Sequence, residues 1–379
     1  MKKIKSFILA TVAFALVAPA FTACSSDDDK KNETVENIIS EFSVNDKMVA
    51  EQKAKSGKNV AVLLVAFGST WNNAFLAFDK TKTAYEAAFP NADVYVCFSS
   101  DICINRASVG ENYDDNGTLV KRDYYEPRYL LHAIGAAKYS KIYVQSLQVI
   151  PGEEFAAVVA SVKKFMNNGY IGEAHLDDAY LAKLAEDEAI FFGMPLLSDP
   201  DVDVPAVAAE LNKLYASEAS QGVVAFMGHG NPDNYDTFKA NVRYTQLEEA
   251  LKEYNKNYFV GTVDMPDNLK MDVLERMRDQ NIKDGKMYLH ALMSIAGDHA
   301  HNDMAGEGDE YWPHPMAPEH EENSWLEFFK HSGYDVEVPL SGKHPQGLLE
   351  LSGILQVWIN HTKNAEFLED AYHSMYPEE

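Results

Sequence analysis

The sequence predicts an α/β protein of two similar halves, each with a parallel sheet of about four strands and helices on both faces. Three observations lead to this fold class. Continuous apolar runs of strand length recur along the chain and end in glycine or polar residues. Segments with helical spacing of apolar residues separate these runs. A break rich in Asp and Pro at residues 197–205 is followed by the same alternation.

The first half begins with the apolar run at residues 60–67, which a Gly-Ser-Thr turn ends. Such runs are typical of parallel strands, because helices cover both faces of the sheet. Shorter apolar runs and helical segments then alternate. The expected strands are 60–67, 94–98, 142–147 and 189–193, and the expected helices are 73–89, 129–138 and 155–166.

The second half repeats this pattern after the break. Its first helix begins with proline at residue 205, which is favoured at the first helical position. The expected strands are 223–227, 258–263, 286–295 and 334–338, with helices at 205–215 and 346–362. We therefore predict a first domain at residues 58–200 and a second at 201–379, with a cleft between them that has room for a flat ligand.

The N-terminus has the pattern of an export signal. Three lysines within the first five residues precede an apolar stretch at residues 7–17, which is too short to span a bilayer. Small residues then lead to Cys24, as in a bacterial lipobox. We predict a signal peptide at 1–23, lipidation of Cys24 and a flexible tether at 24–57, in which an amphipathic stretch at 35–42 can form a short helix. The protein would then be an exported lipoprotein, periplasmic or anchored to the outer membrane or cell surface only through its lipid. The alternative is ordinary cleavage after Ala23.

Charge and composition exclude other classes of protein. The chain has 379 residues, 46% of them hydrophobic, and a formal net charge of −25. Nucleic-acid binding is excluded, because it needs a basic patch. In this sequence, Lys and Arg residues are clustered only within the first five positions. Cys97 and Cys103 are either a disulfide or two buried thiols. The sequence leaves the oligomeric state open.

Polar side chains follow the predicted strands, at the edge of the sheet where open α/β proteins bind their ligands. These residues are Ser69, Thr70, Glu153 and Glu154 in the first half, and His229, Asp264, Asp298 and His299 in the second.

Three of these residues follow three strands of one sheet and form a candidate metal site: His229, Asp264 and His299. Two neutral imidazoles and a carboxylate can bind a divalent ion such as Co²⁺, Fe²⁺, Zn²⁺ or Ni²⁺ and leave coordination positions open. Asp298 is a candidate partner for the second N–H of a ligating histidine. The alternatives are structural: histidines that cap turns or face solvent, and an Asp264 that caps a helix beginning near Pro266.

Other features carry less chemistry. His132 and His361 lie on helical patterns and His290 lies inside a strand, so we expect all three to be structural. The sequence has no glycine-rich dinucleotide loop and no G-x-S-x-G nucleophile motif.

Motifs in both halves resemble the CbiK-type anaerobic cobalt chelatases, relatives of ferrochelatase. They occur in order along nearly all of the expected folded body. The motifs are Ala-Phe-Gly-Ser-Thr at 66–70, Val-Gln-Ser-Leu-Gln-Val-Ile at 144–150, Gly-Glu-Glu-Phe at 152–155, Met-Pro-Leu-Leu at 194–197, Met-Gly-His-Gly at 227–230, Val-Gly-Thr-Val-Asp at 260–264, Gly-Asp-His-Ala-His-Asn-Asp-Met at 297–304 and Ser-Trp at 324–325.

The resemblance implies two flavodoxin-like domains and an enzyme that inserts a divalent metal, Co²⁺ foremost, into sirohydrochlorin or a similar tetrapyrrole. It implies that His229 and His299 bind the metal and act in catalysis, with an acidic third ligand at Asp264. Glu154 would be a further catalytic acid. Ser69 and its neighbour Thr70 would contact the tetrapyrrole.

Three departures from the family separate this chain from a typical member. Asp264 stands where the family usually has Glu, and the loop 306–323 is long and carries Trp312, His314 and His320, either as a cover for the macrocycle or as a solvated insertion. A lipoprotein is also an unusual form for a biosynthetic enzyme. Two hypotheses result: a chelatase, with removal of metal from haem-like substrates as its reverse reaction, or a non-catalytic lipoprotein that binds haem, corrinoid or metal.

Overall fold

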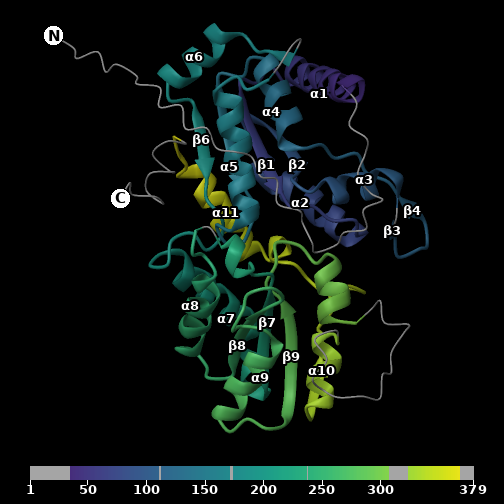
Figure 1. Cartoon of the computed structure of the whole chain (residues 1–379), viewed down its shortest axis with the longest axis vertical. Coiled ribbons are helices and arrows are strands. Elements are labelled where there is room, and N and C mark those ends of the chain that lie inside the picture. The colour runs from purple at the N-terminus through teal and green to yellow at the C-terminus, as the bar shows by residue number, and fades with distance from the viewer. Residues whose placement is uncertain (1–34, 111, 171–173, 237, 307–322, 368–379) are drawn as a thin grey trace, which may run out of the picture. The chain divides into compact units, whose positions relative to one another are not determined.

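Two sheets with parallel strands organise the chain, as the sequence predicts (Figure 1). The computed structural model describes residues 35–110, 112–170, 174–236, 238–306 and 323–367, which lie in one compact unit. The predicted signal peptide, Cys24 and the loop histidines at 314 and 320 lie outside these residues, as does Trp312.

The first sheet has the strand order β11-β6-β5-β1-β2 and the second has the order β10-β9-β7-β8. All pairs are parallel except that of β11 with β6. The strands of the first sheet are β1 (Val60–Ala66), β2 (Ala92–Phe98), β5 (Lys141–Ser146), β6 (Ile190–Gly193) and β11 (Glu366–Phe367). Those of the second are β7 (Val223–Gly228), β8 (Tyr258–Thr262), β9 (Gly285–Ala291) and β10 (Tyr334–Glu337).

Helices cover both faces of each sheet, which confirms the predicted fold class. In the first sheet, alternate residues of β1 face α2 and α11 on one side and α4 and α5 on the other. In the second, α7 and α8 cover one face, and α9 and α10 cover the other. The helices are α1 (Val35–Ser56), α2 (Asn72–Ala88), α3 (Asp101–Val109), α4 (Pro127–Ala136), α5 (Glu153–Met166), α6 (Asp178–Glu186), α7 (Asp203–Gln221), α8 (Val242–Lys252), α9 (Lys270–Asp279), α10 (Trp325–His331) and α11 (Ser352–Lys363).

One apolar core continues from the first sheet into the second. It contains Val62 of β1 and Phe226 of β7, together with residues of α7 and α11 such as Leu211 and Trp358, all fully buried. Close-packed interiors deform little, so this common core fixes the position of one sheet against the other.

The predicted tether is wrong over most of its length. Residues 35–56 form helix α1, which packs against α4 (Figure 1). Val49 is fully buried, and Lys53 Nζ donates to the Ala137 carbonyl over 2.7 Å. The helix is therefore part of the folded body.

The predicted domain boundary at residue 200 also needs correction. The C-terminal helix α11 packs on β5 and β6, and β11 pairs antiparallel with β6. The last segment of the chain therefore returns to the first sheet and adds a fifth strand to it. Amphipathic spacing predicts that this segment is a helix, but it does not say which sheet the helix covers.

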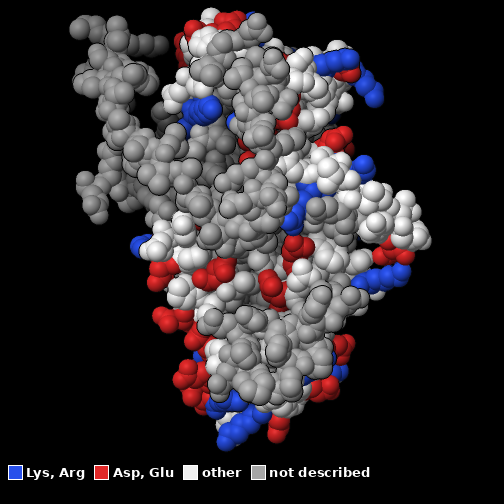
Figure 2. All heavy atoms as spheres, turned by 45° about the vertical axis from the view of Figure 1, so that its right-hand side comes forward, with Lys and Arg blue, Asp and Glu red and all other residues white. Residues whose placement is uncertain are grey.

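Smaller features complete the fold. The polar loop after α3 contains a short hairpin, β3 (Asn112–Tyr113) and β4 (Leu119–Val120). Cys97 and Cys103 carry free thiols, so the disulfide alternative is wrong. None of the helices within the described ranges is long and apolar enough to cross a membrane. Figure 2 shows Asp and Glu side chains in separate groups over one face of the molecule.

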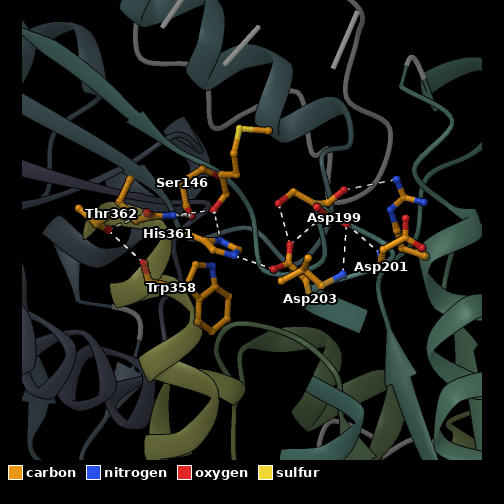
Figure 3. Close-up of polar contacts among 12 residues, drawn as sticks. Ser146, Asp199, Asp201, Asp203, Trp358, His361 and Thr362 are labelled. Carbon is orange, nitrogen blue, oxygen red and sulfur yellow. Dashed lines mark hydrogen bonds and ion pairs between the residues drawn. The ribbon is translucent and has the colours of Figure 1, made fainter. Parts of the chain in front are cut away.

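His361 joins α11 to the first sheet and to α7 (Figure 3). Its Nδ1 contacts the Met194 carbonyl oxygen over 3.0 Å and its Nε2 contacts Asp203 Oδ1 over 2.9 Å. Both partners are acceptors, so the ring makes both hydrogen bonds only as an imidazolium. Burial lowers the pKa of His361, but Asp203 and the Met194 and Pro195 carbonyls outweigh it and raise that pKa above 6.5. Burial raises the pKa of Asp203, but His361 and other donors hold it below 3.8.

We expect His361→Ala to lower the free energy of unfolding by about 3 kcal/mol near pH 5, because it leaves a buried carboxylate without its cation. A raised histidine pKa stabilises the fold below pH 6.5 and loses its effect as the pH rises through the folded-state value. The lowered pKa of Asp203 stabilises the fold above pH 3.8, and this effect is lost as the pH falls through the folded-state value.

Urea unfolding of both proteins at about pH 5 and about pH 9 measures the difference. His331→Ala is the control, because that side chain is 57% exposed. A deficit that is equal at the two pH values would contradict the charged state of His361.

Candidate functional site

The ends of β7 and β8 bring His229 and Asp264 together. Asp264 N–H donates to the His229 carbonyl over 2.9 Å, directly after the two parallel strands. Both glycines beside His229 are required. A Cβ at Gly228 would lie 2.4 Å from the Tyr244 ring, and Gly230 has a φ of +79°, which favours glycine.

The contacts of His229 leave one ring nitrogen available. Its Nδ1 lies 2.7 Å from the Gly230 carbonyl oxygen, which can only accept, so Nδ1 carries the hydrogen. The Nε2 atom then has its lone pair free to bind a metal ion or a proton. This atom faces Asp264 Oδ2 at 3.7 Å, beyond hydrogen-bond distance.

His299 comes from the turn after β9. Residues His299–Met304 form a π-helix, a rare conformation that is frequent at functional sites. The His299 Nδ1 atom forms a short hydrogen bond with Asp303, one helical turn further on. Its Nε2 is therefore the second imidazole nitrogen of the site available to a metal ion. The rings of His299 and His229 lie edge to face with centroids 4.8 Å apart.

The prediction for Asp298 is wrong in one respect. Asp303, not Asp298, accepts the hydrogen bond from the His299 ring. Asp298 instead accepts from the indole N–H of Trp71 over 2.5 Å. Burial lowers the pKa of His299, but the Asp303 bond and charge, with smaller effects of Asp264 and Asp298, raise it above 6.5.

The first half contributes two carboxylates, from the first turn of α5. Burial raises the pKa of Glu154, although the positive charges of His229 and His299 oppose the rise. Burial and the charge of Glu154 also raise the pKa of Glu153, and His229 opposes it. Glu154 therefore lies within electrostatic reach of both imidazoles and holds its proton to a higher pH than an ordinary glutamate.

Asn231 attaches the His229 loop to the start of α5. Its side-chain oxygen accepts from the Glu153 backbone N–H over 3.3 Å. A Cβ at Gly152 would lie 2.6 Å from the Asn231 amide, so the close approach requires glycine. The side chain of Asn241 holds Asn231 in turn. Its oxygen accepts from the Asn231 backbone N–H over 2.9 Å, and its amide N–H donates to the Asn231 carbonyl over 2.7 Å.

Ser69 and Thr70 lie beside this junction. Ser69 is buried, and its hydroxyl accepts the Trp71 backbone N–H over 3.2 Å. A Cβ at Gly297 would lie 3.2 Å from the same hydroxyl, so the loops after β1 and β9 touch. Thr70 is half-buried. Their contact with a tetrapyrrole stays a prediction.

The structural alternative for Asp264 is wrong, because α9 begins only at Lys270. His229, His299 and Asp264 have side chains that are 37%, 28% and 27% exposed, so all three are accessible. Across the described ranges, no three His, Cys, Asp or Glu side chains are already arranged as a metal site. The roles of His229, His299 and Asp264 as metal ligands therefore stay predictions.

Sequence reasoning missed three residues of the site: Asp303, Asn231 and Trp71. The spacing of Asp303, four residues after His299, is the helical contact spacing and was a usable signal. Nothing in the sequence indicates the partners of Asn231 and Trp71, because both act across the junction between the two halves. The expected structural roles of His132 and His290 agree with their bonds to Asp46 and Glu218.

Comparison with known proteins places the chain among metal chelatases. Sirohydrochlorin cobaltochelatase CbiKC of Nitratidesulfovibrio vulgaris is 26% identical over 301 residues, which are 79% of this chain and 88% of that protein. Sirohydrochlorin cobaltochelatase of Salmonella typhimurium is 25% identical over 256 residues, 66% of this chain and 82% of that protein. The solved structure of SirB from Bacillus subtilis with Fe³⁺ aligns with 83% of this chain and 98% of its own, at 12% identity and a TM-score of 0.47.

A sequence profile of one family matches residues 60–366, which include both sheets and the residues of the site. The match begins with β1 and ends within β11. The protein therefore belongs to the cobalt chelatase (CbiK) family.

Proposed function

We propose that this protein is a chelatase that inserts a divalent metal, Co²⁺ foremost, into sirohydrochlorin or a related tetrapyrrole. The observation that carries the proposal is the meeting of His229 and His299 from the second sheet with Glu154 from the first. Membership of the cobalt chelatase family and the names of its two relatives support the choice of metal and macrocycle. Fe²⁺, Ni²⁺ and Zn²⁺ are the other candidate ions.

The chemistry requires an ion to be delivered and protons to be accepted. Insertion replaces the two pyrrole N–H protons of the macrocycle with M²⁺. The Nε2 atoms of His229 and His299 can hold the ion weakly enough to release it. Glu154, whose pKa is raised by burial, can accept one of the two protons, and the other can pass to an imidazole that the ion has left or to solvent. No covalent intermediate is needed.

Asp264 would hold the ion less closely than a glutamate at that position. Two ligands bound to one ion at about 2.1 Å lie about 3.5 Å apart at a tetrahedral angle. The distance from Asp264 Oδ2 to His229 Nε2 is 3.7 Å, slightly longer than this separation between two ligand atoms. A loosely held ion suits an enzyme that passes its metal on.

A non-catalytic binder is the less favoured hypothesis, because binding alone gives no use to a proton-accepting Glu154 beside two imidazoles. Removal of metal from haem-like compounds is the reverse of the same reaction. The net charge of −25 favours removal of metal from such compounds over insertion into sirohydrochlorin, because the negative protein repels a polycarboxylate. Screening at physiological salt leaves local groups to decide between them.

The N-terminal pattern supports a location outside the cytoplasm. Three lysines, an apolar stretch and Cys24 precede an acidic run at residues 26–29, as in lipoproteins exposed on bacterial surfaces. In this proposal the protein is anchored by lipid at Cys24.

We expect the purified protein, mixed with Co²⁺ and sirohydrochlorin, to change the absorbance spectrum as metal enters the macrocycle. His229→Ala should weaken Co²⁺ binding by about tenfold or more, because it removes a ligand nitrogen. His175→Ala is the control, since its side chain is 50% exposed and bonds with Asn168 and Asp178. A wild-type protein that leaves the spectra of sirohydrochlorin and haem unchanged would contradict the enzyme hypothesis.

Two substitutions of Asp264 test its role. Asp264→Glu should raise Co²⁺ affinity, because the carboxylate reaches about 1.5 Å further toward the ion. Asp264→Ala should slow insertion or removal of the metal. Co²⁺ titration and melting temperature are measured on both variants. A loss of stability with unchanged Co²⁺ affinity would reject the ligand role.

Cys24→Ala should move the protein from the membrane fraction to the soluble fraction of lysed cells, because the acylated residue is lost. Immunoblots of the two fractions make the comparison. If the unaltered protein is already in the soluble fraction, the lipoprotein hypothesis fails.

A further inference from the structure

Trp71 lies in the first half, but its side chain makes its hydrogen bond in the second. It follows β1 and directly precedes α2, where it occupies the N-cap position without a capping side-chain bond. Its indole N–H donates to Asp298 Oδ1 over 2.5 Å. Its ring stacks on the His301 ring, with centroids 3.6 Å apart and planes 3° from parallel.

These two contacts are made to the residues on either side of His299. Asp298 directly precedes His299, and His301 follows two positions later in the π-helix. One rigid side chain therefore holds both flanks of the segment that carries the second imidazole. Asn73 strengthens the attachment, since its side-chain N–H donates to the Ala296 carbonyl over 2.9 Å.

The segment that carries His299 needs more support from its surroundings than the loop that carries His229. The loop that carries His229 is held at Tyr244, whose hydroxyl accepts from the Gly230 backbone N–H over 3.4 Å. His299 lies in a π-helix of six residues, which has less regular hydrogen bonding than an α-helix. Two imidazoles can share one ion only if their separation is held within a fraction of an ångström.

We propose that Trp71 is a positioning residue, which sets the separation of His299 from His229 through its contacts with Asp298 and His301. This role rests on the proposed function, because it concerns an ion that both imidazoles bind. It differs from a role in core packing, because the effect comes from one N–H bond and a substitution that keeps the acceptor preserves it.

The test compares substitutions on both sides of that bond. Trp71→Phe keeps a flat ring for the stack on His301 but removes the donor. Asp298→Leu has a similar shape without an acceptor, whereas Asp298→Asn keeps an oxygen that can accept from Trp71. Trp358→Phe is the matched control, because it loses an indole N–H bond to the Gln148 carbonyl in the core without touching residues 298–301.

We expect Trp71→Phe and Asp298→Leu each to weaken Co²⁺ binding about tenfold, as losses of supporting contacts around a metal site do. The Trp71→Phe/Asp298→Leu double variant should be no weaker than either single variant, because both remove the same bond. Asp298→Asn should retain most of the affinity. Trp358→Phe should lower the melting temperature and leave Co²⁺ affinity unchanged, because α11 packs on the first sheet and both imidazoles come from the second. Co²⁺ absorption bands measure binding in the wild-type protein and in all five variants.

A crystal structure of Trp71→Phe measures the separation of the two imidazoles without reference to metal or activity. We expect it to differ from the 4.8 Å between ring centroids seen here. An unchanged separation, or effects of the two single variants that add in the double variant, would overturn the proposal. A wild-type protein that binds Co²⁺ but inserts none would contradict the proposed function alone.

Discussion

The apolar core shared by the two sheets is the constraint on which the site depends. Its residues come from both sheets and from α7 and α11, so neither sheet can move without disrupting the same packing. The imidazoles are attached to one sheet and Glu154 to the other. Polar contacts at the junction, from Asn231 and Trp71, then set the orientation of the side chains. Burial fixes the sheets, and hydrogen bonds fix the polar side chains where the two halves meet.

The protonation of Glu154 is tied to what the imidazoles carry. Burial favours its neutral form, and positive charge on His229 or His299 favours its ionised form. A divalent ion on the two Nε2 atoms would act in the same direction as those charges, and more strongly. In the proposed reaction, departure of the ion to the macrocycle would raise the pKa of Glu154 again, at the stage when pyrrole protons need an acceptor.

The sequence was sufficient for the sheets and for the residues at their edges. Runs such as that of β1 specify buried parallel strands directly, and glycines around His229 specify a sharp turn. It was insufficient for α1, because the buried face of that helix includes the polar Asn45 beside Phe42 and Val49 and gives a weak apolar stripe. It was insufficient for the contacts of Trp71, because periodicity carries no information on which loops meet in space.

The antiparallel pairing of β11 with β6 has a consequence for how the chain folds. The first sheet gains its last strand, and one of its faces gains α11, only from residues near the C-terminus. Contacts between such distant parts of a chain form late and slow the search for the native state. The first half therefore cannot finish folding while the second is still being synthesised. Until then it exposes an uncovered face and an open strand edge, which are surfaces that chaperones recognise and that promote aggregation.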